Sequence, residues 1–293
     1  MSRAVTLYSR HTPGYEQRVN EALALLRQAA AEHAGRVVLT TSLGAEDMVL
    51  SDLIARHKLP IAQATLETGR LHAQTLALIA RLEGHYGVLL EQWRPAREQV
   101  LRFVARNGEM AMRESIELRK ACCALRKLEP LARALQGRTA WLTGLRREQS
   151  DARAEVPLRS IDENGREKFS PLAAWSQADV WHYISTHAVP YNELHDEFFP
   201  SIGCEPCTRA VALGEDIRAG RWWWEGESAK ECGLHAKPHS ADAPAAAAPQ
   251  GGASAVASAQ AHVGAADVSR SQSEDAKECG LNFSQATKKE EHA

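Results

Sequence analysis

Residues 37–50, VVLTTSLGAEDMVL, join a short apolar run, a polar loop and the start of a second apolar pattern. Val37, Val38 and Leu39 predict a buried strand, because a continuous aliphatic run suits a strand that is covered on both faces. The apolar residues from Met48 to Ile54 recur at helical spacing and predict a helix directly after the loop. The unit is therefore strand, polar loop, helix.

The same unit recurs on both sides of this stretch. The pattern predicts helices over 16–33 and 71–82, and strands over 61–66, 88–90 and 139–143. Strands that alternate with helices indicate an α/β fold, with a mostly parallel central sheet and helices on both faces. Ligands of such sheets bind beyond the carboxyl ends of the strands, where Ser42, Thr68 and Gly144 stand.

The composition limits the class of protein. A chain of 293 residues, 44% hydrophobic and 25% charged, suits one large α/β domain or two small ones. A net charge of -2 provides no basic field for sequence-independent binding of nucleic acid. The sequence shows neither a secretory apolar segment nor an apolar run of membrane-spanning length. We therefore expect a cytoplasmic protein with no nucleic-acid or membrane partner.

The composition changes near residue 236 to Ala, Ser, Gly, Pro and Gln. Such a segment has few large apolar groups to offset the entropy of ordering, so we expect a folded domain over 1–235 and a low-complexity flexible tail over 236–293. The hexapeptide AKECGL at 229–234 recurs at 276–281, which indicates a local duplication and gives Cys232 a copy in Cys279.

Six cysteines in a reducing compartment favour metal binding or redox chemistry over a disulfide framework. Cys204 and Cys207 form a CxxC pair, and the tandem Cys122 and Cys123 could complete a four-thiolate site. A structural zinc ion and a thioredoxin-like dithiol are the alternatives. The tandem pair favours an iron–sulfur cluster over zinc, but the spacing alone leaves the choice open.

The loop 42–47 offers hydroxyls, Gly44 and backbone N–H groups at a helix start, which suits a phosphate or sulfate. An ordinary capped helix is the alternative. Basic residues gather after other strand ends and around the cysteines, and together they predict an anionic ester as the ligand, although each could be a surface charge. They are Arg70, Arg126, Lys127, Arg146, Arg147, Arg153, Arg209, Arg218 and Arg221. The three tryptophans 222–224 are interpreted as structural anchors.

Several long motifs resemble the assimilatory adenylyl-sulfate (APS) and phosphoadenylyl-sulfate (PAPS) reductases. They are the loop 42–47, LETGRLH at 66–72, CCALRK at 122–127, GLRREQS at 144–150 and the stretch 190–235. The resemblance covers roughly residues 15–235 and is closest in SIGCEPCTRAVALGEDIRAGRWWWEGESAKECGLH. It implies an adenine nucleotide α-hydrolase-like fold.

The resemblance also implies an activity, namely thioredoxin- or glutaredoxin-dependent reduction of APS to sulfite and AMP in sulfate assimilation and cysteine biosynthesis. The Cys232 thiolate would attack sulfur and form an S-sulfonate. Matching motif positions imply catalytic roles for Lys127, Arg218, Arg221 and His235, which would surround the sulfate and phosphate. The implied substrate-binding residues are Ser42, Gly44, Thr68, Gly69, Arg70, Gly144 and Arg153.

In that family, members with both cysteine pairs carry a [4Fe-4S] cluster and generally use APS, so the resemblance implies this cofactor on Cys122, Cys123, Cys204 and Cys207. It leaves a homo-oligomer open. The chain departs from the family in its tail, where Asn282 stands in place of the His after the second KECGL. Cys279 is then a spare nucleophile, a resolving thiol or a relic.

Two other functions remain as alternatives. A ligase or sulfurtransferase of the ATP pyrophosphatase type would need a Ser-Gly-Gly-x-Asp-Ser loop, and residues 42–47 lack the second Gly and the final Ser. A non-enzymatic metal-containing regulator would use Cys232 as a sensor and would need no nucleotide pocket.

Overall fold

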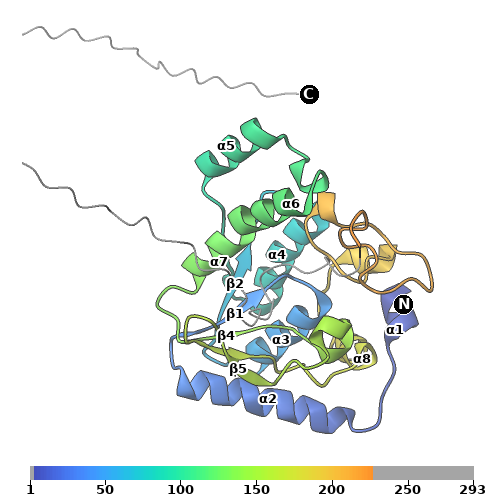
Figure 1. Cartoon of the computed structure of the whole chain (residues 1–293). Helices are drawn as coiled ribbons and strands as arrows, with labels where there is room; N and C mark the ends of the chain where they lie inside the picture. The colour runs from blue at the N-terminus through green and yellow to red at the C-terminus, as the bar shows by residue number, and fades with distance from the viewer. Residues whose placement is uncertain (1–2, 227–293) are drawn as a thin grey trace, which may run out of the picture. The chain divides into compact units, whose positions relative to one another are not determined.

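The computed structural model describes residues 3–226, which contain a single six-stranded sheet in the order β3-β2-β1-β4-β6-β5 (Figure 1). The strands are β1 Val37–Thr41, β2 Ala62–Leu66, β3 Glu91–Trp93, β4 Ala140–Leu142, β5 Arg159–Ile161 and β6 Glu167–Phe169. All neighbouring strands are parallel except β5 and β6, which are antiparallel. The predicted α/β fold with a mostly parallel sheet is confirmed.

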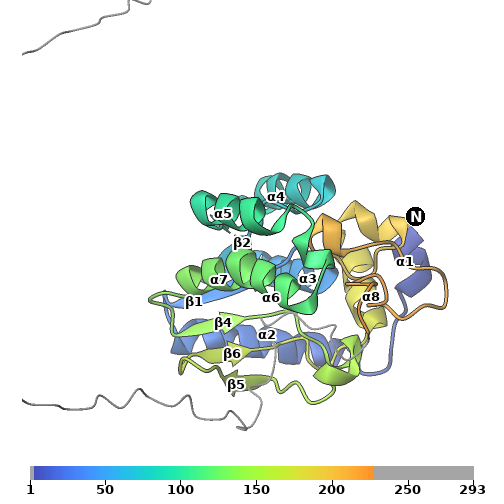
Figure 2. The same ribbon diagram turned by 45° about the horizontal axis from the view of Figure 1, so that its top comes forward.

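Eight α-helices accompany the sheet in the described part of the chain (Figures 1 and 2). They are α1 Arg3–Tyr8, α2 Tyr15–Glu32, α3 Ala45–Arg56, α4 Ala73–Tyr86, α5 Arg97–Asn107, α6 Ile116–Cys123, α7 Glu129–Ala134 and α8 Gln177–His187. None of the described helices has both the length and the apolar character that crossing a membrane requires.

Apolar residues cover both faces of the sheet. Val38 of β1 packs in one buried group with Leu131 and Leu135, which lie in and just after α7. Its neighbours Val37 and Leu39 belong to the main core, which includes residues of α2, α3, α4 and α8. Because successive strand side chains point to opposite faces, the unbroken run 37–39 contributes to both cores.

The order of the strands creates a crevice. The chain passes from β1 through β2 to β3 on one side, and β4 then pairs with the other side of β1. In an open parallel sheet, the reversal separates the loops that follow these two strands and leaves room for a ligand. The loop after β1 contains Ser42, and the loop after β4 contains Gly144.

The predicted strand over 88–90 is wrong, since the strand of this region is β3, three residues later. Leu89 is 89% exposed, and the Leu90 backbone N–H donates to the Glu83 carboxylate at 3.0 Å instead of joining the sheet. The predicted helix over 71–82 begins two residues late, at Ala73, because Leu71 forms a β-bridge with Cys204.

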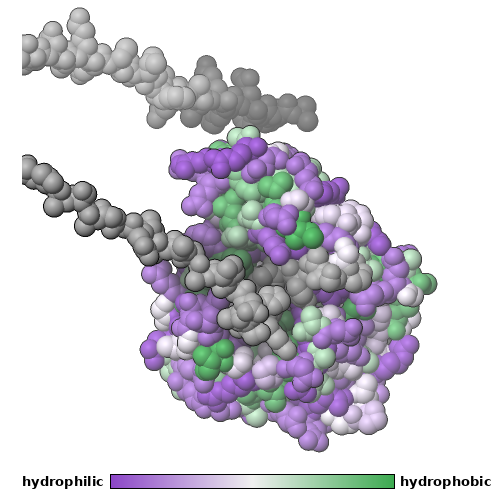
Figure 3. All heavy atoms as spheres, viewed as in Figure 1, coloured by the Kyte–Doolittle hydropathy of each residue, from purple (hydrophilic) through white to green (hydrophobic). Residues whose placement is uncertain are grey.

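Helix α5 stands apart from the cores, and none of its residues is buried. On the face shown in Figure 3, polar side chains predominate, and apolar ones gather mainly next to this helix. Phe103 of α5 nevertheless packs against the buried cysteine group described below.

Candidate functional site

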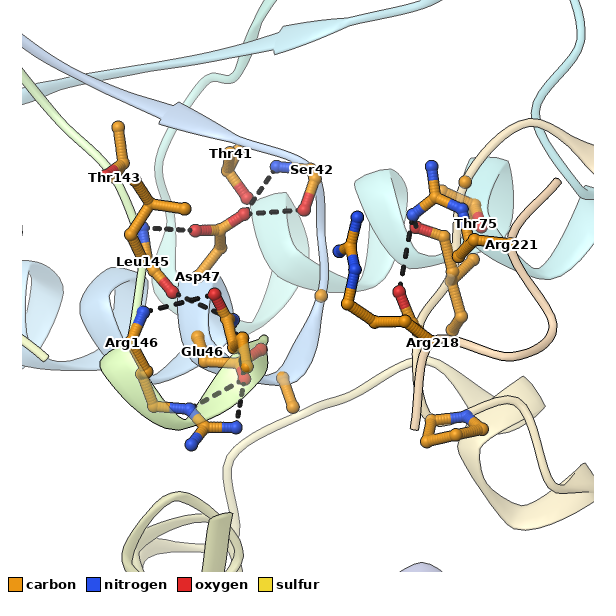
Figure 4. A pocket seen from close by; sticks show the side chains of 18 of the residues that line it. Thr41, Ser42, Glu46, Asp47, Thr75, Thr143, Leu145, Arg146, Arg218 and Arg221 are labelled. Carbon is orange, nitrogen blue, oxygen red and sulfur yellow. Dashed lines mark hydrogen bonds and ion pairs between the residues drawn. The ribbon is translucent and has the colours of Figure 1, made fainter. Parts of the chain in front are cut away.

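Asp47 joins the two loops at the strand reversal (Figure 4). Its Oδ2 accepts hydrogen bonds from the Ser42 backbone N–H at 2.6 Å and from the Ser42 hydroxyl at 2.7 Å, while its Oδ1 accepts the Gly144 N–H at 3.0 Å. A Cβ on Gly144 would lie 2.4 Å from Asp47 Oδ1, so this position requires glycine. Ser42 does not cap α3, whose N-cap residue is Gly44.

Burial raises the pKa of the Asp47 carboxyl to about 6, although the hydrogen bonds from Ser42 and Gly144 act in the opposite direction. Burial also acts to raise the pKa of neighbouring Glu46, but the Arg146 guanidinium, together with hydrogen bonds from the backbone and Gln149, outweighs it, and the pKa of Glu46 is lowered. At neutral pH the first turn of α3 therefore carries two carboxylates.

Two of the predicted anion-binding arginines are paired with carboxylates. Arg146 is buried and lies 2.9 Å from both Glu46 and Glu148. Arg209 pairs with Glu215 at 2.9 Å. Both side chains thus already have acidic partners, although Arg146 also lines the cavity described next. That these two cations converge on a bound anion stays a prediction.

A cavity of about 230 Å³ lies between the two loops and the segment around residues 200–222. Its walls include most of the residues proposed from the sequence, namely Ser42, Gly44, Thr68, Lys127, Gly144, Arg153, Arg218 and Arg221. Figure 4 shows the Arg218 side chain extending toward the loop of Ser42. The cavity therefore combines backbone-rich loops from the sheet with cations from the later part of the chain.

Gly69 and Arg70 do not line this cavity. Gly69 has a left-handed φ of 69°, and its N–H donates to the Glu67 carboxylate. Arg70 donates to the Glu109 backbone carbonyl at 3.3 Å and lies 3.5 Å from the Glu109 carboxylate. Their proposed direct contact with substrate is thus not supported, and they shape the turn after β2 instead.

The four predicted metal ligands lie in one buried group with Met112 and Trp222. Cys122 and Cys123 end helix α6, whereas Cys204 directly precedes a short 3₁₀ turn that ends at Cys207. The β-bridge from Leu71 to Cys204 holds the CxxC segment beside the turn after β2. Cys204 also lines the cavity, and its sulfur lies 3.3 Å from the Thr68 hydroxyl. The group and the cavity therefore share a wall.

The chemistry of the four sulfurs suits a bound metal centre. None of the four forms a disulfide, and each side chain is more than nine-tenths buried. Burial raises the pKa of Cys122 and raises that of Cys207 to about 11, so these thiols need a cation to become thiolates at neutral pH.

Lys127 comes to the cavity through an irregular helix. Residues Ala124–Leu128 form a π-helical turn between α6 and α7, so the tandem cysteines are followed at once by a change in helical winding. Arg126 in this turn is buried and donates to the Thr68 carbonyl at 2.7 Å. The turn thereby places Arg126 against the Thr68 loop and Lys127 in the cavity wall.

The sequence prediction missed other residues of the cavity, including Trp141 on β4, Gln149 and His195. Gln149 lay within a quoted motif, and its amide bonds the Glu46 carboxylate at 3.0 Å. His195 likewise lay within the quoted stretch 190–235, but it was not singled out there, because its place in the cavity wall depends on the packing of distant segments. Cys232, His235 and Cys279 lie outside the described residues.

Comparison with known proteins agrees with this site. The chain is 54% identical to the adenosine 5'-phosphosulfate reductase of Allochromatium vinosum over 73% of its length and 84% of the relative's. It is 51% identical to the enzyme of the same name from Burkholderia cepacia, over 76% and 90% of the two chains.

Among solved structures, the phosphoadenylyl-sulfate (PAPS) reductase from Candida auris, in a phosphate complex, matches with a TM-score of 0.55 and 28% identity. The match covers 67% of this chain and 98% of the other. Residues 36–210 match the family model described as "Phosphoadenosine phosphosulfate reductase domain". These findings confirm the resemblance seen in the motifs, and the chain belongs to the phosphoadenosine phosphosulfate reductase family.

Proposed function

We propose that this chain is an APS reductase, which converts adenosine 5'-phosphosulfate to sulfite and AMP in sulfate assimilation and cysteine biosynthesis. The observation that carries the proposal is the wall shared by a cation-lined cavity and four buried cysteines, with Cys204 in both. The named relatives, about half of whose residues are identical to this chain, support the same activity.

In this proposal the two loops at the strand reversal hold the nucleotide. Ser42, Gly44 and Gly144 bring backbone close to the ligand, and Thr68 closes the adjacent wall. Lys127, Arg153, Arg218 and Arg221 surround the phosphate and sulfate. Attack by a thiolate on an anionic sulfate requires such cations, because they offset the repulsion between the approaching negative charges.

The reaction then has two steps. The Cys232 thiolate forms a bond to the substrate sulfur, the bond from sulfur to the bridging oxygen breaks, and AMP leaves with that electron pair. A thioredoxin or glutaredoxin thiolate then attacks the Cys232 sulfur and releases sulfite, and its second thiol reduces the mixed disulfide. The reductant's two thiols thus supply both electrons, while His235 and the nearby cations favour the thiolate of Cys232.

We assign the cofactor to the buried cysteine group. Cys122, Cys123, Cys204 and Cys207 would hold a [4Fe-4S] cluster, in keeping with their burial in one group. The bound group would supply charge next to Lys127 and so influence the field at the sulfate. The two cysteine pairs also support APS over PAPS as substrate. We further propose residues 1–235 as the catalytic domain, on the composition change near residue 236, and the cytoplasm as the enzyme's location.

The test is an anaerobic assay of thioredoxin-dependent sulfite release with the cluster-loaded protein. We expect turnover of APS to exceed that of PAPS and to disappear in Cys232→Ser. Mass spectrometry of the protein with APS and no reductant should detect a sulfonate on Cys232. Equal or better turnover of PAPS would refute the substrate preference, and absence of the adduct would refute the mechanism.

A further inference from the structure

Arg119 of helix α6 and Glu225 form an ion pair that is more deeply buried than any other in the described chain. Arg119 Nε lies 2.6 Å from Glu225 Oε1, and the two side chains are 1% and 4% exposed. Taking both charges out of water costs free energy, and replacing such a pair by apolar residues is often neutral or stabilising. Stability alone therefore does not explain the pair.

Trp222 connects this ion pair to the cavity. The guanidinium of Arg119 lies 4.6 Å from the centre of the Trp222 indole, and the guanidinium of Arg221 lies 4.7 Å from the same ring. Glu225 is held at this place by its backbone N–H, which donates to the Trp222 carbonyl at 2.9 Å. One turn of chain therefore brings the carboxylate and the indole to the same arginine.

The turn is strained. Trp222 has a left-handed φ of 42°, which a bulky side chain rarely adopts, so surrounding contacts must hold it in place. The Trp222 side chain is 1% exposed, and its backbone N–H donates to the Cys207 carbonyl at 3.2 Å. Arg119 and Glu225 provide the charged part of that support.

Arg221 depends on this support for its position. It lines the cavity, and it pairs with no carboxylate in the described part of the chain. Its guanidinium packs on Gly203 so closely that a Cβ there would lie 2.5 Å from Nη2. The Arg221 guanidinium thus has Gly203 on one side and the Trp222 indole on another. These two contacts leave the guanidinium little freedom to move.

Glu225 also solves an electrostatic problem. Two guanidinium groups that contact one buried indole repel each other, and the repulsion is strong where water is excluded. The Glu225 carboxylate neutralises Arg119, so that the charge of Arg221 is kept for the ligand.

We propose that Arg119 and Glu225 are positioning residues that act through Trp222 to hold Arg221 against the anionic part of the substrate. The ion pair would link the helix that carries Cys122 and Cys123 to a second cation of the cavity, in addition to Lys127. This inference rests on the proposed function only for the identity of the anion.

The test compares Glu225→Asp with Glu225→Gln in a Cys232→Ser background, so that bound APS is not consumed. Aspartate keeps the charge but is one methylene too short for the 2.6 Å contact, whereas glutamine removes the charge. Calorimetry measures the affinity of each variant for APS, AMP and adenosine. Only variants whose iron content equals that of the parent are compared. Asp52→Asn is the matched control, because Asp52 is a buried carboxylate paired with Arg56 away from the cavity.

If Arg221 is displaced, its charge-assisted hydrogen bond to the anionic part of the ligand is lost. The loss of one such bond weakens binding by about tenfold or more. We expect both Glu225 variants to lose about tenfold in affinity for APS, with adenosine within twofold of the parent and the control unchanged. In an Arg221→Met background, Glu225→Asp should have no additional effect, because the group that it positions is gone.

The alternative outcomes are distinct. Equal APS affinity in Glu225→Asp and its parent would overturn the positioning role. Tighter binding by Glu225→Gln with no change in Glu225→Asp would replace it with a purely electrostatic effect. A parent protein that binds neither APS nor AMP would overturn the proposed function, and with it the identity of the anion.

Discussion

Arg146 and Arg221 carry the same guanidinium group and both line the cavity, yet their surroundings give them different roles. Arg146 lies between the carboxylates of Glu46 and Glu148, so its charge is balanced by two acidic groups, one of them in the first turn of α3. Arg221 contacts the Ser201 hydroxyl, the Ile202 carbonyl and an indole, none of which cancels its charge. The acidic neighbours therefore decide which cations remain available to an anion.

Asp47 offers a direct test of how the two loops are held. In Asp47→Asn, only one of the two side-chain atoms can accept a hydrogen bond, so either the Ser42 or the Gly144 donor loses its partner. A buried donor without a partner costs about 1–3 kcal/mol, and we expect AMP affinity to fall about tenfold. Calorimetry checks this, with Asp52→Asn as the control. Unchanged affinity would mean that the loops hold their places without Asp47.

The pH dependence of stability gives a second test of Asp47. Its pKa is raised to about 6, above the ordinary value of 3.8 for an aspartate, so the folded state binds the proton more tightly than the unfolded state. The stabilising contribution is therefore complete below about pH 4 and is lost as the pH rises through 6. The difference in free energy of unfolding between wild type and Asp47→Asn should fall by at most about 3 kcal/mol over that range. Denaturant titrations at several pH values measure this difference. If the free energies of unfolding of the two proteins change in parallel with pH, the prediction is contradicted.

At the scale of elements, apolar runs predicted the centre of the sheet well and its edges poorly. Strands β1 and β2 begin within one residue of their predicted positions because they are buried in any packing of the fold. Strand β3 was misplaced, since EQW is less apolar than the loop residues 88–90 before it. The anion site was only partly predictable, because charge pairs such as Arg146 with Glu46 join residues 100 positions apart.

The π-helical turn Ala124–Leu128 is an element that no sequence pattern indicated. Deleting the exposed Ala124 should restore a regular α-helix and preserve the packing of α7, but it should turn Lys127 away from the cavity. We expect the variant to remain folded and to lose at least tenfold in APS turnover. Circular dichroism and iron content check that the variant is folded, and sulfite release measures its turnover, with Ala124→Ser as the length-matched control. Full turnover in the deletion variant would show that the irregular turn is dispensable.

Over the whole molecule, two features that are separate in sequence become one site. The reversal of strand order opens a crevice between β1 and β4, and the cysteine group closes its far wall through Cys204 and Thr68. The nucleotide end is thus built from the sheet, and the anionic end from segments around the cysteines. A change in the cysteine group should consequently affect the anionic part of a ligand more than its adenosine part.

The last prediction concerns the duplicated motif beyond the described residues. Cys232 lies 11 residues after Arg221, and Cys279 lies 58 residues after Arg221. The second copy of the motif has Asn282 where the first has His235. The composition predicts a flexible connector, for which effective concentration falls roughly as the −3/2 power of length, and this prediction puts the second thiol about tenfold lower at the cavity. We expect Cys279→Ser to keep sulfite release within twofold of wild type, and Cys232→Ser to abolish both turnover and the protein sulfonate. A sulfonate on Cys279 in wild type, or a large loss of turnover in Cys279→Ser, would instead give the copy a share in the reaction.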